Sequence, residues 1–573
     1  MAQSVHFEIF SRRGSKGGWK LVEVRNTRDD AITYAKQLMG EDVTGVKVVK
    51  ETYNEESGDY LSLKIFEDGH NKMKLTPEQE DVPHALPCFK PDDFYSYHAR
   101  KTIARLIPDF LARHKLTVSE LGHRADMLEK LEASGTLLQH AIQKIAVAQA
   151  ASSSVPVQQI IKSLIALTNK AFQRVYRDAR KARFPLAKPG AFGALAEKLA
   201  GESDGRYLFN GALAAHLKDA EGWDEKVFRL LALMDEAGED GQGAQLLLSS
   251  VDTVISEILS GSAALHELIG PQKNFGAAIE SLVRLFLGRE PDPAAAGLGL
   301  ISLTKRFAAD RLPDSRGAIA ARITKEFRSN RRLCPESLRE EFMTLRRIAN
   351  SMVCGVGKYL SHEDLVNAFV MRSKRLITHE TLGEFLAGNL TPDEKLERML
   401  FVEENIIGAE NKRLLVSFVF PIVQSAAFEE YFKQGKIPLL PRLQRLAALH
   451  LRLRQSGFQE PKRSELAETL DRLACAVAES GKLFESIEKK PGSPAEKAEL
   501  LLRLFESDSF TEPMLSTRAR EAMLGFLSRP GFLRFYVAQQ GGQADTDAAI
   551  SELVGMLEKI GIAREAGLSA IAA

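Results

Sequence analysis

The sequence predicts a small α+β module followed by a large all-α body made of helical repeats or bundles. Two observations predict this fold class. Residues 5–66 alternate between apolar and polar side chains, which is the period of half-buried strands, whereas the chain beyond residue 93 carries the 3.6-residue period of amphipathic helices. A third observation, similarity among three later stretches of the chain, indicates repetition within the helical body.

Composition sets the broad class. The chain has 573 residues, of which 44% are hydrophobic and 27% are charged, as in ordinary globular proteins, so a disordered, collagenous or fibrous protein is excluded. The 77 Lys and Arg residues nearly balance the 76 Asp and Glu residues. The chain as a whole is therefore not a dedicated polyanion binder, although local basic patches remain possible.

The front of the chain has the pattern ββαββ. Residues 5–9 and 19–24 are β-rich and flank a glycine-rich turn, residues 27–39 carry one apolar helical stripe, and residues 46–49 and 61–65 are β-rich again. We expect an antiparallel sheet with this single helix on one face.

The glycine-rich turn at 14–18 admits two interpretations. A phosphate-binding loop requires GxxxxGK followed by Ser or Thr between a strand and a helix, whereas these glycines lie between two strands. A hairpin turn, which needs residues that accept positive φ, is the favoured interpretation. The fragment 355–358 fails the same test, because its glycines are too close together.

The body divides by composition. Prolines mark a polar connector after the sheet, and a second proline-rich stretch interrupts the helical pattern near its middle. The predicted domains are a module at 1–69, a linker at 70–93, a helical domain with one repeat at 94–287, a partly flexible junction at 288–316, and a helical domain with two more repeats at 317–573.

The three similar stretches begin at residues 224, 393 and 495. Each starts with an acidic-basic helix, continues with an apolar helix and an apolar or aromatic corner, and ends with an amphipathic helix. Chance similarity of amphipathic helices is the alternative, but the same order three times favours a repeat. Thr391 and Ser493 are each followed directly by a proline and, three residues after the hydroxyl residue, by a glutamate, and this pattern predicts a helix cap at both positions. Gly408 is expected to end a helix.

The sequence offers no convincing catalytic or metal site. His362 and His379 are each followed by acidic residues, as a metal site requires, but Ser361 and Thr378 indicate that both clusters are helix starts. No nucleophile motif is present, and the four cysteines are far apart. We therefore expect no enzyme activity, no metal and no cofactor.

The strongest chemical feature is a set of basic residues at helical spacing. Residues three to four positions apart share one helix face, which could meet an acidic protein surface or phosphates. The alternative is a solvated face paired with acidic neighbours. The candidate partner-binding residues are Arg322, Lys325, Arg328, Arg331, Arg332, Arg346, Arg347, Arg442 and Arg445.

Neither end nor interior of the sequence suggests a membrane protein. No signal peptide is apparent at the start, and the longest apolar run, 414–423, is about half the roughly 20 residues that a spanning helix needs. We expect a cytoplasmic protein without membrane insertion.

Repeated helical units mostly serve as binding surfaces. The predicted function is a non-catalytic interaction scaffold or regulatory adaptor that binds protein partners. The alternative is a nucleic-acid-associated regulator that uses the basic helices around 322–347 and 442–463, and an enzyme of unidentified type is third. The sequence does not specify the partner or the oligomeric state.

Overall fold

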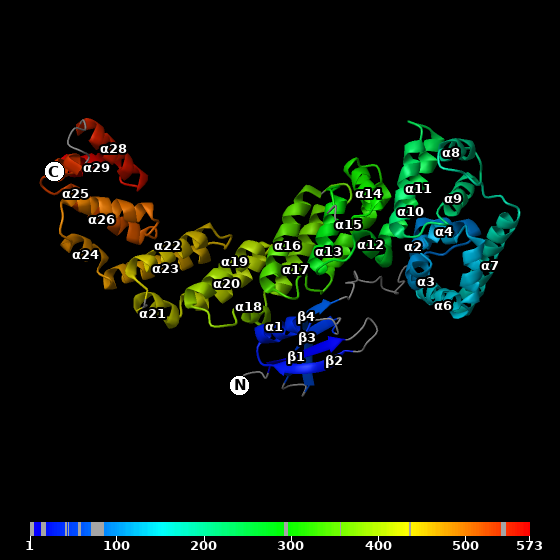
Figure 1. Cartoon of the computed structure of the whole chain (residues 1–573), viewed down its shortest axis with the longest axis horizontal. Helices are drawn as coiled ribbons and strands as arrows, with labels where there is room; N and C mark the ends of the chain where they lie inside the picture. Colours follow the sequence, from blue (N-terminus) through cyan, green and yellow to red (C-terminus); the bar gives the residue numbers. More distant parts are fainter. Residues whose placement is uncertain are drawn as a thin grey trace. The chain divides into compact units, whose positions relative to one another are not determined.

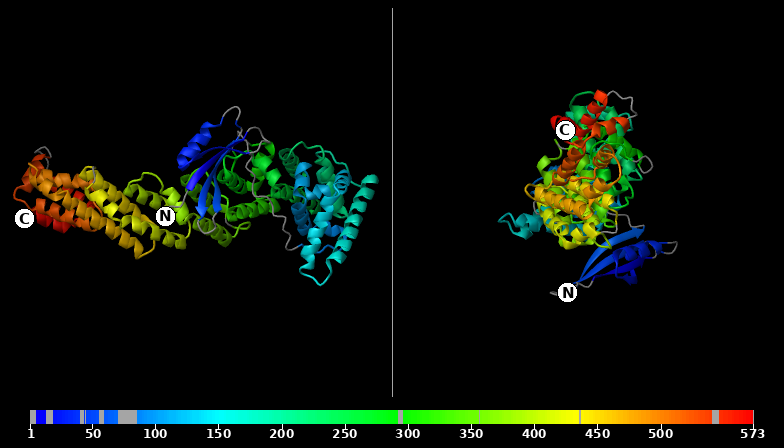
Figure 2. Two further views of the ribbon diagram at one scale, coloured as in Figure 1. Left: turned by 90° about the horizontal axis from the view of Figure 1, so that it is seen from below. Right: turned by 90° about the vertical axis from the view of Figure 1, so that its left-hand side faces the viewer.

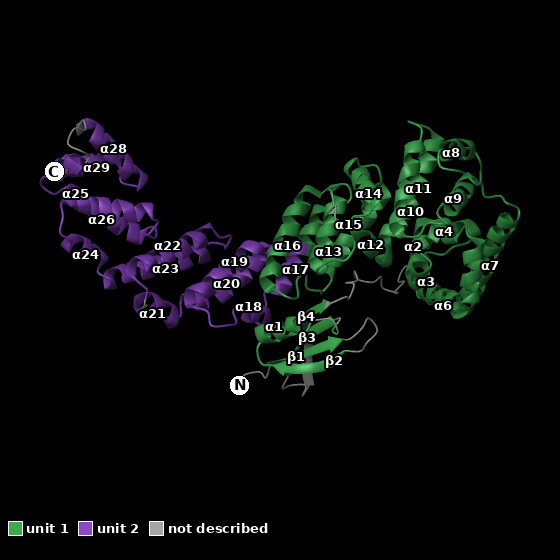
Figure 3. Cartoon of the chain, viewed as in Figure 1, with its two compact units in different colours: residues 1–368 green, residues 369–573 purple. Residues whose placement is uncertain are grey.

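The structure is a computed structural model that describes residues 5–12, 19–39, 43, 45–54, 59–69, 85–291, 296–355, 357–434, 437–539 and 546–572. The chain forms two compact units, Met1–Ala368 and Phe369–Ala573 (Figure 3). The domain boundaries expected from composition remain predictions.

The first unit begins with the expected ββαββ module (Figure 1). All three strand pairings are antiparallel, and the strand order is β2-β1-β3-β4. The prediction of an antiparallel sheet with one helix is therefore confirmed, while the turn at 14–18 lies outside the described residues. The elements are β1 (Val5–Arg12), β2 (Lys20–Arg25), α1 (Arg28–Gln37), β3 (Gly45–Asn54) and β4 (Asp59–Gly69).

The helix α1 covers one face of this sheet (Figure 2). Thr27 caps the helix, since its hydroxyl accepts a hydrogen bond from the backbone N–H of Asp30 at 3.3 Å. Alternate side chains of the strands point to the helix and are buried, as the period-two pattern requires. The core residues are Phe7, Ile9, Ala31, Ile32, Ala35, Val46, Val48, Ile65 and Phe66.

Every later element with regular structure, in the part of the chain described, is helical, as predicted. In the first unit these are η1 (Pro91–Tyr95), α2 (Tyr97–Leu106), α3 (Pro108–Arg113), α4 (Val118–Leu121), α5 (Ala125–Ala133), α6 (Thr136–Ala150), α7 (Val157–Arg180), α8 (Phe192–Ala200), α9 (Gly205–His216), α10 (Trp223–Leu233), η2 (Met234–Glu236), α11 (Gln242–Ser260), α12 (Ser262–Ile269), α13 (Phe275–Phe286), α14 (Leu298–Ala308), α15 (Pro313–Arg328), α16 (Leu338–Met352) and η3 (Val353–Gly355).

The boundary between the compact units falls within α17 (His362–Leu376). The helices of the second unit are α18 (His379–Phe385), α19 (Pro392–Asn405), α20 (Ala409–Val423), α21 (Ala426–Gln434), α22 (Leu439–Gln455), α23 (Lys462–Ser480), α24 (Leu483–Lys489), α25 (Pro494–Glu506), α26 (Met514–Leu527), α27 (Phe532–Gln539), α28 (Thr546–Lys559) and α29 (Arg564–Ala572).

Buried carboxylates join helices that are not adjacent in the sequence, in both units. Asp252 of α11 accepts hydrogen bonds from the backbone N–H groups of Asp314 and Ser315, at 2.8 and 2.9 Å, where α15 begins. Asp471 of α23 does the same for the first residues of α26, Met514 and Leu515, at 2.6 and 3.2 Å. Each carboxylate satisfies N–H groups that a helix start leaves unpaired, so it caps one helix from the side of another.

The helix order recurs in the three stretches that the sequence singled out. The groups α10–α13, α19–α22 and α25–α28 each contain two long helices, one short helix and a further long helix. The short helices α12, α21 and α27 have eight, nine and eight residues, whereas the other members of the groups have 11 to 19. The same order also occurs in α16–α19 and α22–α25, so it recurs along the helical body and is not specific to the three stretches.

The segment 288–316, for which composition predicts a partly flexible junction, contains α14, whose Leu300, Leu303 and Phe307 are buried in the core. One local expectation was wrong. Gly408 does not end α19, which stops at Asn405; it is the N-cap of α20, where its φ of +105° suits glycine. The caps at Thr391 and Ser493 are confirmed, since Glu394 accepts from the N–H of Thr391 and Ser493 accepts from that of Glu496.

Among the described residues, no single helix is long and apolar enough to cross a membrane. Two bent helix pairs, α11 with α12 and α20 with α21, reach that length and apolarity only together.

Candidate functional site

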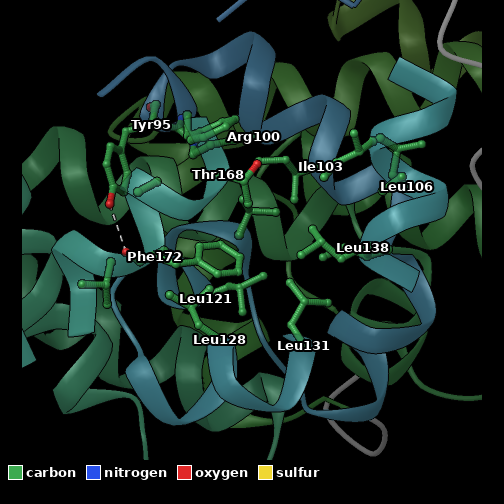
Figure 4. A pocket seen from close by; sticks show the side chains of 18 of the residues that line it. Tyr95, Arg100, Ile103, Leu106, Leu121, Leu128, Leu131, Leu138, Thr168 and Phe172 are labelled. Carbon is green, nitrogen blue, oxygen red and sulfur yellow. Dashed lines mark hydrogen bonds between the residues drawn. The ribbon is translucent and has the colours of Figure 1, made fainter. Parts of the chain in front are cut away.

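An apolar pocket lies within the first helical bundle, where α2, α4, α5, α6 and α7 come together (Figure 4). Its volume is about 120 Å³. Leucine and isoleucine side chains from α2, α4, α5 and α6 form much of its wall, and α7 contributes Ala171, Phe172 and Val175. The apolar lining residues include Ile103, Leu106, Leu121, Leu128, Leu131, Leu138, Ile142, Ile145 and Phe172.

The polar groups of the pocket gather at one end, where Figure 4 shows Arg100 and Thr168 close together and Leu128 and Leu131 at the opposite end. The Arg100 guanidinium donates to the carbonyl of Tyr95 at 2.5 Å, and its Nε lies 2.7 Å from a carboxylate oxygen of Glu257. The Arg100–Glu257 pair has no net charge when both groups are ionised.

Glu257 is held on its other side by α4. The backbone N–H and the hydroxyl of Ser119 donate to its two oxygens at 2.9 and 2.8 Å. Burial raises the pKa of Glu257, against the opposing effect of Arg100 and of these hydrogen bonds. The carboxylate therefore fixes Arg100 in place and links α11 to α2 and α4.

Behind Tyr95, a buried histidine packs among aromatic rings. The centre of the His123 ring lies 5.1 Å from that of Tyr95 and 5.0 Å from that of Tyr207, and His123 Nδ1 is 2.7 Å from the carbonyl oxygen of Ser119. The pKa of His123 is lowered to about 4, mainly by burial and to a smaller extent by the charges of Arg174 and Arg100. His123 is therefore neutral near pH 7 and serves the packing of the bundle.

The predicted basic residues of α15 and its C-terminal flank do not share one exposed face. Arg322 has only 4% of its surface exposed and forms an ion pair with the buried Glu326 at 2.8 Å, so its side chain is not part of an exposed basic face. Arg331 lies over the ring of Phe275 at 4.3 Å, and burial lowers its pKa. The side chains of Lys325 and Arg332 are half-buried.

The arginines of the second basic stretch form ion pairs and hydrogen bonds between helices of the second unit. Arg445 of α22 pairs with Asp393 and with Glu397 of α19, both at 2.8 Å. Arg442 donates to the backbone carbonyls of Phe432 and Lys433 at 2.6 and 3.0 Å. The charge of Arg445 is thus matched by acidic neighbours, as the alternative interpretation of the basic stretch expects.

Three of the predicted residues are exposed: Arg328, Arg346 and Arg347. Arg328 pairs with Asp364 at 2.9 Å, and Arg347 pairs with Glu280. Such exposed pairs are weak and are easily exchanged for a partner's carboxylate. Surface-accessible basic charge from the predicted set is therefore concentrated at the end of α15 and on α16.

In the described ranges, no group of three or more His, Cys, Asp or Glu side chains is placed to hold a metal ion. His362 and His379 are the first residues of α17 and α18, and the hydroxyls of Ser361 and Thr378 accept the hydrogen bonds expected of helix caps. All four cysteines are free thiols, and burial raises the pKa of Cys334 to about 12.

The sequence analysis missed the apolar pocket. Its lining comes from separate helices spread over residues 94–175, and each of those helices shows only an ordinary apolar stripe. A sequence signal for the polar end would have been Arg100 within the otherwise apolar stripe of α2, but nothing in the sequence pairs it with Glu257.

Comparison of the chain with protein-family models, with curated proteins and with solved structures finds no match in any of the three. The function is therefore inferred from the geometry alone.

Proposed function

We propose that the protein is a non-catalytic, cytoplasmic scaffold whose helical body binds partner proteins. The observation that carries this proposal is the recurrence of one helix order in α10–α13, α19–α22 and α25–α28. Repeated helical units stack into long surfaces that mostly serve to bind other macromolecules. The carboxylate caps at Asp252 and Asp471 support rigidity of such a surface, because each one fixes two helices at a buried point.

The charge distribution favours a protein partner over nucleic acid. Nucleic-acid binding depends on several cations that are free to replace counterions on phosphates. Of the predicted basic residues, Arg322, Arg442 and Arg445 are instead engaged by groups of the chain itself. A small set of exposed arginines, Arg346 and Arg347 among them, suits a limited acidic patch on a folded partner.

The test uses the full-length chain as bait in nuclease-treated extract of its native cells, followed by titration of each purified partner by calorimetry. The proposal expects a stoichiometric complex with a protein, weakened in a chain that carries Arg346→Glu and Arg347→Glu. Arg503→Glu is the control, because Arg503 is also exposed and also paired with a glutamate, on a helix surface in the other compact unit.

Two results would contradict the proposal. One is a complex that nuclease abolishes, together with binding of RNA or DNA that falls by several orders of magnitude between about 50 and 200 mM salt, as multiple phosphate contacts predict. The other is turnover of a substrate by the purified chain.

A further inference from the structure

We propose that the apolar pocket among α2, α4, α5, α6 and α7 binds a small uncharged molecule that combines a short apolar chain or ring with one hydrogen-bond-accepting oxygen, such as an alcohol, ketone, ester or amide. This site is separate from the exposed arginines of the proposed scaffold surface.

The size of the pocket sets the size of the ligand. At about 120 Å³, it is slightly smaller than a cavity of about 150 Å³ lined by Leu, Ile and Phe side chains that binds benzene in another protein. Drug-sized ligands need pockets of roughly 300 Å³ or more. The occupant therefore has about six non-hydrogen atoms or fewer.

The wall determines the chemistry of most of the ligand. Most of the lining side chains carry no polar atom. They include Leu128 and Leu131 from α5, Leu138 and Ile142 from α6, and Phe172 from α7. Apolar side chains next to empty space lose dispersion contacts that an apolar occupant restores. A chain or ring of carbon atoms recovers those contacts, whereas a polar molecule would lose its hydration without replacement.

The polar end supplies donors for one acceptor oxygen. A guanidinium has five N–H groups, which is more than the contacts of Arg100 with Tyr95 and Glu257 use. The hydroxyl of Thr168 makes no hydrogen bond with any described residue, unlike that of Thr304, which donates to the carbonyl of its own helix at 2.9 Å. Thr168 faces the pocket beside Arg100 (Figure 4), so the two side chains can donate to the same atom.

The charge balance excludes a carboxylate as the preferred head group. Glu257 already neutralises Arg100, and Ser119 satisfies both of its oxygens. A second carboxylate beside this pair would be a partly buried charge without a counterion, which is unfavourable. An uncharged oxygen accepts the same hydrogen bonds without that penalty.

The test titrates the full-length protein with butanol, butanamide, butanoate and benzene, and follows binding by ligand-observed NMR and by the shift in melting temperature. Butanol, butanamide and benzene should bind, and butanoate should bind at least about ten-fold more weakly than butanamide. Thr168→Val, which keeps the shape of the side chain, should weaken butanamide binding by about three- to ten-fold and leave benzene binding unchanged.

A variant that fills the pocket tests the location. Ala141→Leu places a larger side chain in the lining and should abolish binding of all the probes, whereas Ala148→Leu, on the same helix but outside the lining, should not. If Ala141→Leu fails to fold, the contrast between butanamide and benzene in Thr168→Val decides. Absence of binding by every probe, binding that Ala141→Leu leaves intact in a folded protein, or butanoate binding as tightly as butanamide would overturn the proposal.

Discussion

Removing the carboxylate of Asp252 should release the start of α15 from α11. Asp252 has 4% of its surface exposed, and it accepts from the N–H of Asp314, the N–H of Ser315 and the hydroxyl of Ser315, at 2.8, 2.9 and 2.6 Å. In Asp252→Ala the two N–H groups lose their acceptor inside the protein. The hydroxyl keeps one partner, since it also lies 3.2 Å from the carbonyl of residue 252.

The expected loss follows from these contacts. Each buried donor left without an acceptor costs about 1–3 kcal/mol, so two N–H groups give about 2–6 kcal/mol. Part of this is offset, because burial raises the pKa of Asp252 and so opposes its ionised form. We expect a net loss of about 3 kcal/mol, which corresponds to a roughly 100-fold increase in the population of opened α15.

Hydrogen exchange of the full-length protein measures this opening helix by helix. Amides in α15 should exchange roughly 100-fold faster in Asp252→Ala, and by a smaller factor in Asp252→Asn, which retains one acceptor oxygen. Ser315→Ala is the matched control, because it removes a hydrogen bond to the same carboxylate but leaves the two backbone bonds in place. Unchanged protection of α15 in Asp252→Ala would refute the inference that this carboxylate holds the two helices together.

Three further predictions follow from burial and charge. In the folded protein the pKa of His123 is about 4, below the value of about 6.5 in an unfolded chain. The contribution of His123 to stability is therefore complete above about pH 6.5 and is lost as the pH falls towards 4. The variant His123→Phe should reduce the acid-induced loss in unfolding free energy by about 3 kcal/mol. The variant Arg322→Glu should unfold or strongly destabilise the first unit, because it places a second carboxylate against the buried Glu326. The variant Arg346→Glu, at an exposed position, should change the melting temperature little. Equal changes in melting temperature for the two variants would contradict the burial of Arg322. Residues 1–69 alone should give a mixed α/β circular dichroism spectrum, and a purely helical or unfolded spectrum would show that the module depends on the rest of the chain.

The sequence predicts most of the fold because periodicity reports which face of an element is buried. The alternation of Phe7 and Ile9 with polar residues identifies a strand that is covered on one side, and helix α1 provides that cover. Helix caps are equally local: the Thr27 hydroxyl accepts from the backbone N–H of Asp30, and the Glu394 carboxylate accepts from that of Thr391, in each case three residues away. Such features need no knowledge of distant contacts.

The same periodicity could not decide which basic residues face solvent. Arg322 and Arg328 are both basic residues on α15, but Arg322 shares the buried side with Ile319 and Ile323, whereas Arg328 is exposed. Glu326 lies four residues after Arg322, and this helical spacing in the sequence is compatible with the internal ion pair between them. The pocket was beyond local reasoning altogether, since Arg100 and Glu257 meet across 157 positions of sequence.

The most direct test of the stacked helical scaffold is the solution behaviour of a chain that ends at residue 492, compared with the full chain by light scattering and thermal melting. This truncation removes α26, which packs on α23, and leaves the fully buried Asp471 without the helix start that it caps. The account predicts aggregation or a clearly lower melting temperature for the second unit, because the apolar face of α23 becomes exposed. A truncated chain that remains monomeric and melts at the same temperature as the full-length protein would contradict it and would make 493–573 a separate domain.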